Sequence, residues 1–264
     1  MRVMAPLKWM LRPLVPVCLD EILDARKALS RVSKRPWADA FSAAKRSAWE
    51  QSRLAILPQK LLPLSFVIDV GANHGQWIGS LLEFLAIPEV WIFEPNPEAM
   101  RACRERIGTR PGVTFFDLAL GELPGQAELH VTASSDFASI LPPRSDFLEA
   151  HYGKNAAHVV EKKQIPVVTL DSLFAEPRTV DLLKIDVQGF ERAVLCGARR
   201  VLENTRAVLM EVNLQSHYAG DDTLPALWNM LANQGFSLWS LSPPFTGVDG
   251  KALWADALFL KSDS

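Results

Sequence analysis

The stretch FVIDVGANHG, residues Phe66–Gly75, marks a change of character in this 264-residue sequence. It begins with a short β-branched apolar run, Phe66–Val70, and ends in a loop that carries Gly71 and Gly75. A buried strand that leads through a glycine turn into a helical pattern is typical of the first unit of an open α/β sheet. Because ligands bind such sheets at the carboxyl ends of the strands, this loop is the first candidate binding site.

Strand-like and helix-like segments alternate through most of the sequence after this loop. Near-continuous apolar strands separated by helices favour a mostly parallel sheet that is covered on both faces. The last two strands are joined by a Pro- and Gly-rich loop, which predicts an antiparallel hairpin at the sheet edge. A polar insert, about residues 121–170, interrupts the alternation, and inserts of this kind commonly contact substrates. The expected strands are 66–70, 90–93, 113–116, 127–131, 164–168, 180–185, 207–212, 236–239 and 257–260, and the later expected helices are 97–107, 189–202 and 223–233.

Charge divides the chain near the same point. Residues 1–65 hold 12 Lys and Arg against 5 Asp and Glu, a net charge of +7, whereas the whole chain has −2 and residues 66–264 therefore have −9. We expect a basic, glycine-free helical extension over residues 1–65 and a second domain over residues 66–264. The extension either packs on that domain as a lid, or its residues 1–60 make a peripheral contact with an anionic membrane surface or a lipid-linked substrate.

Composition excludes several classes of protein. At 48% apolar and 22% charged residues, the chain is an ordinary globular protein. Its three cysteines have neither zinc-site nor disulfide-framework spacing, which favours a reducing, cytoplasmic compartment. The basic excess is confined to residues 1–65 and lacks interleaved aromatics, so we expect no nucleic acid partner. Oligomeric state is left open by the sequence.

The first 20 residues resemble a signal peptide in being basic and apolar. Arg12, Pro13 and Pro16 interrupt the apolar run, however, and no small-residue cleavage site follows cleanly. We expect this segment to be retained. No stretch reaches the roughly 18–20 apolar residues that a membrane-spanning helix needs.

Two correctly spaced features point to a cofactor that carries a nucleoside. The loop reads G-x-x-x-G from Gly71 to Gly75, which lacks part of the G-x-G-x-x-G pattern that cradles a pyrophosphate. Glu94 follows about 20 positions later, at the end of the next strand, where a carboxylate can bind both hydroxyls of a ribose. A nucleoside without a pyrophosphate suggests S-adenosylmethionine. A nicotinamide-dependent oxidoreductase is the alternative, and the incomplete glycine pattern disfavours it.

Five blocks in order resemble the FkbM-type family of S-adenosylmethionine-dependent methyltransferases. They are VIDVGANHGQW, WIFEPNPEA, DLALGE, VVTLDSL and DLLKIDVQGFERAVLCGA, and the likeness runs from about Phe66 to Leu260. The resemblance implies a Rossmann-like class I methyltransferase fold, an α/β fold with a seven-strand, mostly parallel sheet. It also implies a bacterial enzyme that transfers a methyl group to a hydroxyl of a sugar, glycan, glycolipid or secondary metabolite.

The resemblance also implies cofactor contacts. Two positions depart from the family pattern: Gln188 stands where Glu is most common, and Asp117 where Asn is common. The first could weaken an acid cluster at that point, whereas the second leaves an adenine contact plausible. The implied contacts are Asp69, Gly71, Asn73 and Gly75 at the methionine end, Glu94 at the ribose, Asp117 and Leu118 beside the adenine, and Ser139 close to the cofactor.

Candidate catalytic residues end or follow two later strands. Asp186 closes the strand 180–185, Glu211 lies near the end of 207–212, and His217 lies in the loop after it. They can serve as bases that take a proton from an acceptor hydroxyl, or as ligands for a divalent metal, which the spacing allows and does not require. A fold-retaining module without turnover is a further alternative, which Gln188 keeps open.

Two groups near these residues have alternative roles. Lys184 and Glu191 can form a structural ion pair at the junction of strand and helix. The aromatic residues Phe137, Phe147 and Tyr152 of the insert are the best candidates for lining an acceptor pocket.

Overall fold

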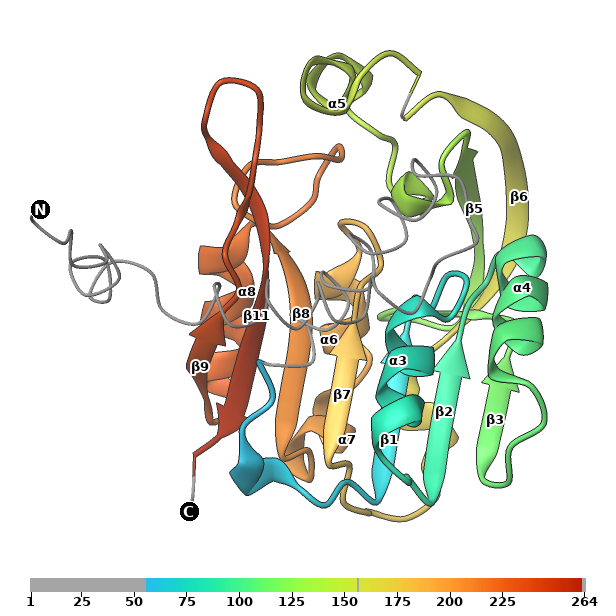
Figure 1. The fold of residues 1–264 in the computed structure, drawn as a ribbon, viewed down its shortest axis with the longest axis vertical. Coiled ribbons are helices and arrows are strands. Elements are labelled where there is room, and N and C mark those ends of the chain that lie inside the picture. The colour runs from blue at the N-terminus through green and yellow to red at the C-terminus, as the bar shows by residue number, and fades with distance from the viewer. Residues whose placement is uncertain (1–55, 156, 263–264) are drawn as a thin grey trace, which may run out of the picture. The chain divides into compact units, whose positions relative to one another are not determined.

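The computed structural model describes residues 56–155 and 157–262, which form an α/β fold around one large sheet (Figure 1). The sheet has eight strands in the order β10-β11-β8-β7-β1-β2-β3, with β9 paired to β11. The run from β8 to β3 is parallel, whereas β11 is antiparallel to both β8 and β9. The strands are β1 (Phe66–Val70), β2 (Glu89–Phe93), β3 (Val113–Phe116), β7 (Leu182–Ile185), β8 (Ala207–Asn213), β9 (Phe236–Leu241), β10 (Phe245–Thr246) and β11 (Ala252–Lys261).

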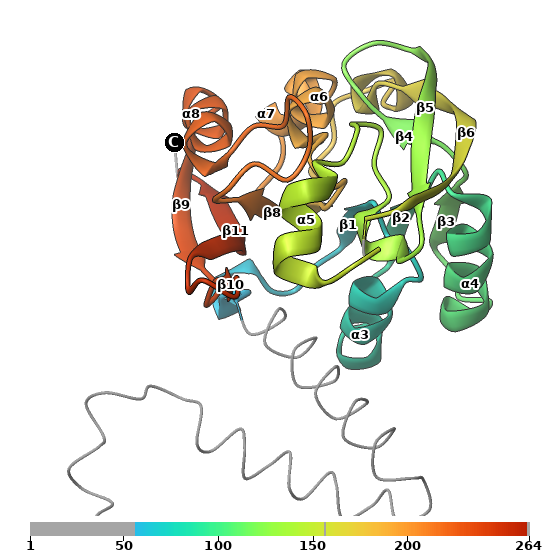
Figure 2. The same cartoon turned by 90° about the horizontal axis from the view of Figure 1, so that it is seen from above.

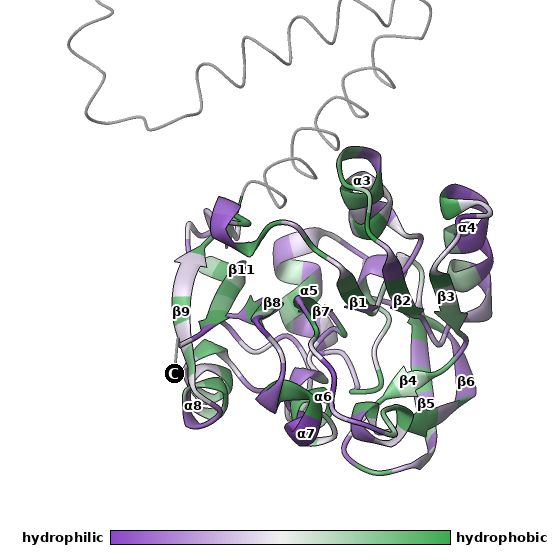
Figure 3. Cartoon of the chain, turned by 90° about the horizontal axis from the view of Figure 1, so that it is seen from below, coloured by the Kyte–Doolittle hydropathy of each residue, from purple (hydrophilic) through white to green (hydrophobic). Residues whose placement is uncertain are grey.

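The central strands β1 and β7 are apolar except at Asp69 and Lys184, because both faces of the sheet are covered. Every residue of β1 and of β7 is buried. In the view from above, α3 and α4 cover one face, and α6, α7 and α8 cover the other (Figure 2). The hydropathy colouring shows the apolar strands between helices that carry polar positions (Figure 3). The helices are α3 (Gln76–Phe84), α4 (Pro97–Ile107), α5 (Ser145–Tyr152), α6 (Glu191–Cys196), α7 (Arg199–Glu203) and α8 (Leu224–Asn233).

The insert forms a second, three-stranded sheet in the order β4-β6-β5. Its strands are β4 (Ala119–Leu120), β5 (Gly125–Thr132) and β6 (Val159–Val168), and α5 lies between β5 and β6 in the sequence. Seen from above, α5 lies over the carboxyl ends of the central strands (Figure 2). The insert therefore covers the edge of the sheet where the site was expected.

The α/β prediction is confirmed, with some differences in detail. The expected seven strands are present, and the eighth is the two-residue β10, which is too short to leave a periodic signal. The expected helix 189–202 is two helices, and an added Cβ at Gly197, between them, would overlap the carbonyl oxygen of Gly121. The predictions for residues 1–55 lie outside the described residues, and the boundary at residues 65 and 66 stays a prediction.

Candidate active site

The loop after β1 is held tightly against its neighbours. The backbone N–H groups of Gly71 and Ala72 both donate to the carbonyl of Phe93 at the end of β2. Gly71 and Gly75 have φ of 75° and 71°, in the left-handed region that favours glycine. An added Cβ at Gly71 would overlap the carbonyl oxygen of Asp186. The two glycines thus allow the loop to pass close to the ends of β2 and β7.

Glu94 is buried at the end of β2, with 7% of its surface exposed. Its Oε2 accepts from the backbone N–H of Asn73 at 2.8 Å, and its Oε1 accepts from that of Asn96 at 2.8 Å. Burial raises the pKa of Glu94 to about 7, although these backbone hydrogen bonds oppose the shift. A carboxylate has about four acceptor positions, so Glu94 retains capacity for the hydroxyls of a ribose.

Asn73 supplies a second observation that fits a bound cofactor. Its backbone is left-handed, with φ of 49°, and its Nδ2 donates to Asp136 Oδ1 at 3.2 Å. Its Oδ1 is buried and has no hydrogen-bond partner among the described residues. A buried acceptor of this kind is costly unless a donor completes it. An amino group, as at the methionine end of S-adenosylmethionine, is such a donor, so the loop fits this cofactor.

Asp69 and Asp186 share a buried cation. Lys184 Nζ lies 3.1 Å from Asp69 Oδ1 and 3.4 Å from Asp186 Oδ2, and it donates to the carbonyl of Gly71 at 3.2 Å. Glu191 Oε1 instead accepts from the backbone N–H groups of Val187 and Gly189, and burial raises the pKa of Glu191 to about 7. The ion pair at this junction therefore joins Lys184 to Asp69 and Asp186.

The other predicted cofactor residues lie around the same strand ends. Asp117 follows β3 and forms an exposed ion pair with Arg104 of α4, with 2.6 Å between Oδ2 and Nη2. Leu118 packs against the main hydrophobic core. Ser139, from the insert, is buried, and its Oγ donates to the carbonyl of Gln188 at 2.6 Å. Their contacts with the cofactor stay predictions.

Gln188 joins two of the predicted catalytic residues. Its Nε2 donates to Asp186 Oδ1 at 2.9 Å and to Glu211 Oε1 at 3.0 Å. Its Oε1 accepts from the hydroxyl of Tyr218 at 2.8 Å. The structure therefore brings Asp186 and Glu211 into one polar network at the ends of β7 and β8.

His217 reaches this region through an aromatic partner. Its Nδ1 lies 2.6 Å from the carbonyl oxygen of Gln215, which can only accept, so Nδ1 carries the proton. Its Nε2 then accepts from the hydroxyl of Tyr152 at 2.8 Å. Burial is the main cause that lowers the pKa of His217, and this favours the neutral ring. Burial raises the pKa of Tyr152 and the charge of Glu211 raises it further, which places Tyr152 electrostatically close to the carboxylate pair.

Aromatic rings from three parts of the chain surround His217 and Tyr152. We call Phe137, Phe147, Tyr152, His217 and Phe245 the aromatic cluster. Phe137 packs edge-on against Tyr152 with ring centroids 5.0 Å apart, and Phe147 packs edge-on against His217 at 5.2 Å. Phe245 of β10 stacks on Tyr152 at 5.3 Å. The three insert aromatics expected to line a pocket therefore lie together, beside the two catalytic candidates of β8 and its loop.

Sequence reasoning missed Tyr218 and the bridging role of Gln188. Tyr218 is 1% exposed, and its hydroxyl lies 2.8 Å from Gln188 Oε1 and 3.4 Å from the carbonyl oxygen of Phe137. In the sequence, Gln188 stands out only as a departure from the family pattern, and this departure is the signal that could have indicated its role.

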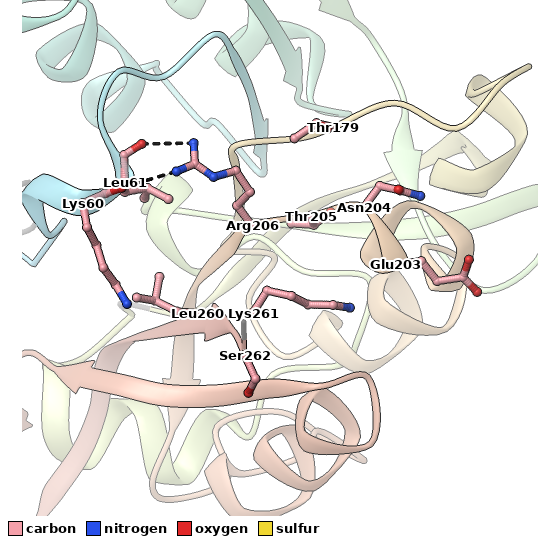
Figure 4. Close-up of a pocket in the computed structure, with 10 residues that line it drawn as sticks. All are labelled: Lys60, Leu61, Thr179, Glu203, Asn204, Thr205, Arg206, Leu260, Lys261 and Ser262. Carbon is pink, nitrogen blue, oxygen red and sulfur yellow. Dashed lines mark hydrogen bonds between the residues drawn. The ribbon is translucent and has the colours of Figure 1, made fainter. Parts of the chain in front are cut away.

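Two further features of the described residues concern metal binding and a cavity outside this network. Within residues 56–155 and 157–262, no three His, Cys, Asp or Glu side chains are grouped as ligands for a metal ion. A cavity of about 560 Å³ lies between the segment before β1 and the ends of β8 and β11 (Figure 4). Arg206, in its wall, is already bonded to Asp181 Oδ1 at 2.7 Å and to the carbonyl of Leu61 at 3.3 Å. This cavity contains none of the predicted site residues.

Comparisons with known proteins agree with the α/β fold. The Methyltransferase FkbM domain matches residues 69–238, which is more than half of the chain. The 2-O-methyltransferase NoeI of Sinorhizobium fredii (strain NBRC 101917 / NGR234) is 27% identical over 201 residues, covering 72% of this chain and 79% of NoeI. The crystal structure of methyltransferase FkbM from Methylobacillus flagellatus KT shares the fold, with a TM-score of 0.50 and 15% identity. That alignment covers 90% of this chain and 58% of the solved chain. The chain belongs to the FkbM family of S-adenosylmethionine-dependent methyltransferases.

Proposed function

We propose that this methyltransferase methylates a hydroxyl oxygen of a sugar, glycan, glycolipid or hydroxylated secondary metabolite. The observation that carries the proposal is the pair of carboxylates, Asp186 and Glu211, at the ends of adjacent parallel strands, joined through Gln188. A relative named as a 2-O-methyltransferase, at 27% identity, supports oxygen as the acceptor atom. Because the chain belongs to a methyltransferase family, the alternative of a nicotinamide-dependent oxidoreductase is dropped.

The loop after β1 and the end of β2 would hold the cofactor. Glu94 would accept from the ribose hydroxyls, and the Oδ1 of Asn73 would accept from the amino group of the methionine end. Gly71 and Gly75 keep the loop free of side chains, and Asp69 fixes the loop indirectly through Lys184. Bound S-adenosylmethionine supplies the methyl group on a positively charged sulfur.

The protein's own contribution is a base and an oriented acceptor. A hydroxyl is a poor nucleophile until its proton is leaving, so a carboxylate within hydrogen-bond reach of it accelerates the transfer. We assign this role to Asp186 or Glu211. His217 is the third candidate, and it would act through the Tyr152 hydroxyl because its Nε2 already accepts from that group.

The aromatic cluster would bind the acceptor. Its rings offer apolar faces beside polar hydroxyl and imidazole groups, a combination that suits a sugar ring with one apolar and one polar aspect. Because α5 lies over the strand ends, the same rings would exclude water from the reacting atoms (Figure 2).

An acceptor screen tests the proposal. The full chain is incubated with S-adenosylmethionine carrying a deuterated methyl group and a panel of nitrophenyl glycosides, and products are read by mass spectrometry. We expect a mass gain of one labelled methyl on at least one glycoside, with loss of turnover in Asp186→Asn and Glu211→Gln. The exposed carboxylate variant Glu128→Gln is the matched control. No labelled product from any glycoside, or near-normal turnover of both variants, would sink this assignment.

We also propose a cytoplasmic enzyme whose residues 1–60 contact the inner face of the membrane. The support is the charge of this segment and not its structure, since residues 1–55 lie outside the described part. None of the helices in the described part is long and apolar enough to cross a bilayer.

A further inference from the structure

Gln188 occupies a backbone conformation that few residues adopt. Its φ is 56°, in the left-handed region, and it lies two residues after Asp186 in the turn that follows β7. The Oγ of Ser139 donates to its carbonyl at 2.6 Å, so the insert holds this backbone in place. Strain of this kind persists where the surrounding structure fixes it, and it commonly marks a functional position.

The side-chain amide of Gln188 has one consistent orientation. The oxygens of Asp186 and Glu211 are acceptors, so the NH₂ end must face them, at 2.9 and 3.0 Å. The oxygen end then faces Tyr218, whose hydroxyl donates to it at 2.8 Å. Tyr218 is fully buried, and its hydroxyl completes the oxygen end of the amide while the two carboxylates fix the amide's orientation.

Two carboxylates on neighbouring strands repel each other unless a donor lies between them. The other groups around this pair include Lys184 on β7, 3.4 Å from Asp186 Oδ2, and Glu191, Tyr152 and Tyr218, which interact with its charges. The amide NH₂ of Gln188 donates to both carboxylates and so lowers the repulsion between them. A glutamate at this position would supply acceptors in place of those two donors.

We propose that Gln188, oriented by Tyr218, is a positioning residue that holds Asp186 and Glu211 as a fixed pair facing the acceptor. In this role Gln188 acts through the two carboxylates. The expected effects on kcat and KM rest on the proposed function.

Three variants separate positioning from packing. Gln188→Met keeps the length of the side chain and removes both donors, Gln188→Glu replaces the donors with acceptors, and Tyr218→Phe removes only the orienting hydroxyl. With the glycoside identified by the acceptor screen, we expect Gln188→Met and Gln188→Glu to lower kcat at least tenfold. The KM for S-adenosylmethionine should stay within twofold. The double variant Gln188→Met/Tyr218→Phe should lower kcat no more than Gln188→Met alone does, because Tyr218 acts through the amide.

A second measurement needs no acceptor. In ¹H–¹⁵N spectra of the wild-type chain, we expect a glutamine side-chain NH₂ pair that is shifted downfield and protected from solvent exchange, absent from Gln188→Met. An ordinary, rapidly exchanging amide at Gln188 would overturn the proposal. A kcat within twofold of wild type in Gln188→Met would overturn it as well. If no acceptor turns over at all, the proposed function fails while the amide signal still decides the role of Gln188.

Discussion

At the scale of single residues, Glu94 links cofactor binding to pH. Its pKa is raised to about 7 by burial, so the carboxyl gains a proton as pH falls below 7. A protonated carboxyl gives up one acceptor position, which weakens its bonds to ribose hydroxyls. We expect the Kd for S-adenosylhomocysteine, measured by calorimetry, to rise about tenfold from pH 8 to pH 6, the limit for one proton with this pKa.

The control for this prediction is Glu94→Gln. This variant should bind S-adenosylhomocysteine more weakly than wild type at pH 8, and its Kd should not change between pH 8 and pH 6. Glu191 also has a pKa raised to about 7, and the comparison isolates Glu94 from it. A wild-type Kd that is constant between pH 6 and pH 8 would contradict the assigned role of Glu94.

Gly71 shows how one missing Cβ positions the site. Its φ is +75°, and an added Cβ would overlap the backbone oxygen of Asp186. We expect Gly71→Ala to lower the free energy of unfolding by more than about 2 kcal/mol, because backbone strain and a clash add together. Gly125 has open space around it and no positive φ, so Gly125→Ala should leave the free energy of unfolding almost unchanged. Urea titrations of the two variants make the comparison, and equal losses would show that the loop yields to the added methyl.

At the scale of elements, Lys184 ties β1 to β7. Its ammonium lies between Asp69 and Asp186, and the Lys184 and Asp69 side chains are 4% and 0% exposed. Lys184→Met removes the cation and leaves two carboxylates without it, which typically costs about 3–5 kcal/mol. The exposed pair of Lys162 with Glu128 is the matched control, and Lys162→Met should leave the unfolding midpoint almost unchanged. Similar losses of stability in both variants would show that the buried ion pair stabilises the fold no more than the exposed one does.

The elements near the sheet centre could be predicted, and the network between them could not. Burial on both faces makes β1 and β7 apolar except at Asp69 and Lys184, and that pattern is local. The contact of Gln188 with Glu211 instead depends on the parallel pairing of β7 with β8 and on the left-handed turn at Gln188. The role of Tyr218 could not be predicted for the same reason, since its partner Gln188 lies 30 positions away. Position at a strand end thus identifies candidate residues, whereas their hydrogen-bond partners require the fold.

At the scale of the whole molecule, charge is divided between the two ends of the sequence. Residues 1–65 have a net charge of +7 and the rest has −9. A basic residue near an anionic bilayer contributes about 1 kcal/mol to binding, and salt screens this attraction. We expect the full chain to sediment with phosphatidylglycerol vesicles, more weakly at 0.5 M salt, and not with phosphatidylcholine vesicles. Replacing Arg26, Lys27, Arg31, Lys34 and Arg35 with Gln should reduce vesicle binding at least tenfold and leave affinity for S-adenosylhomocysteine unchanged. Binding that is insensitive to these substitutions would leave the basic segment without a membrane role and favour the lid.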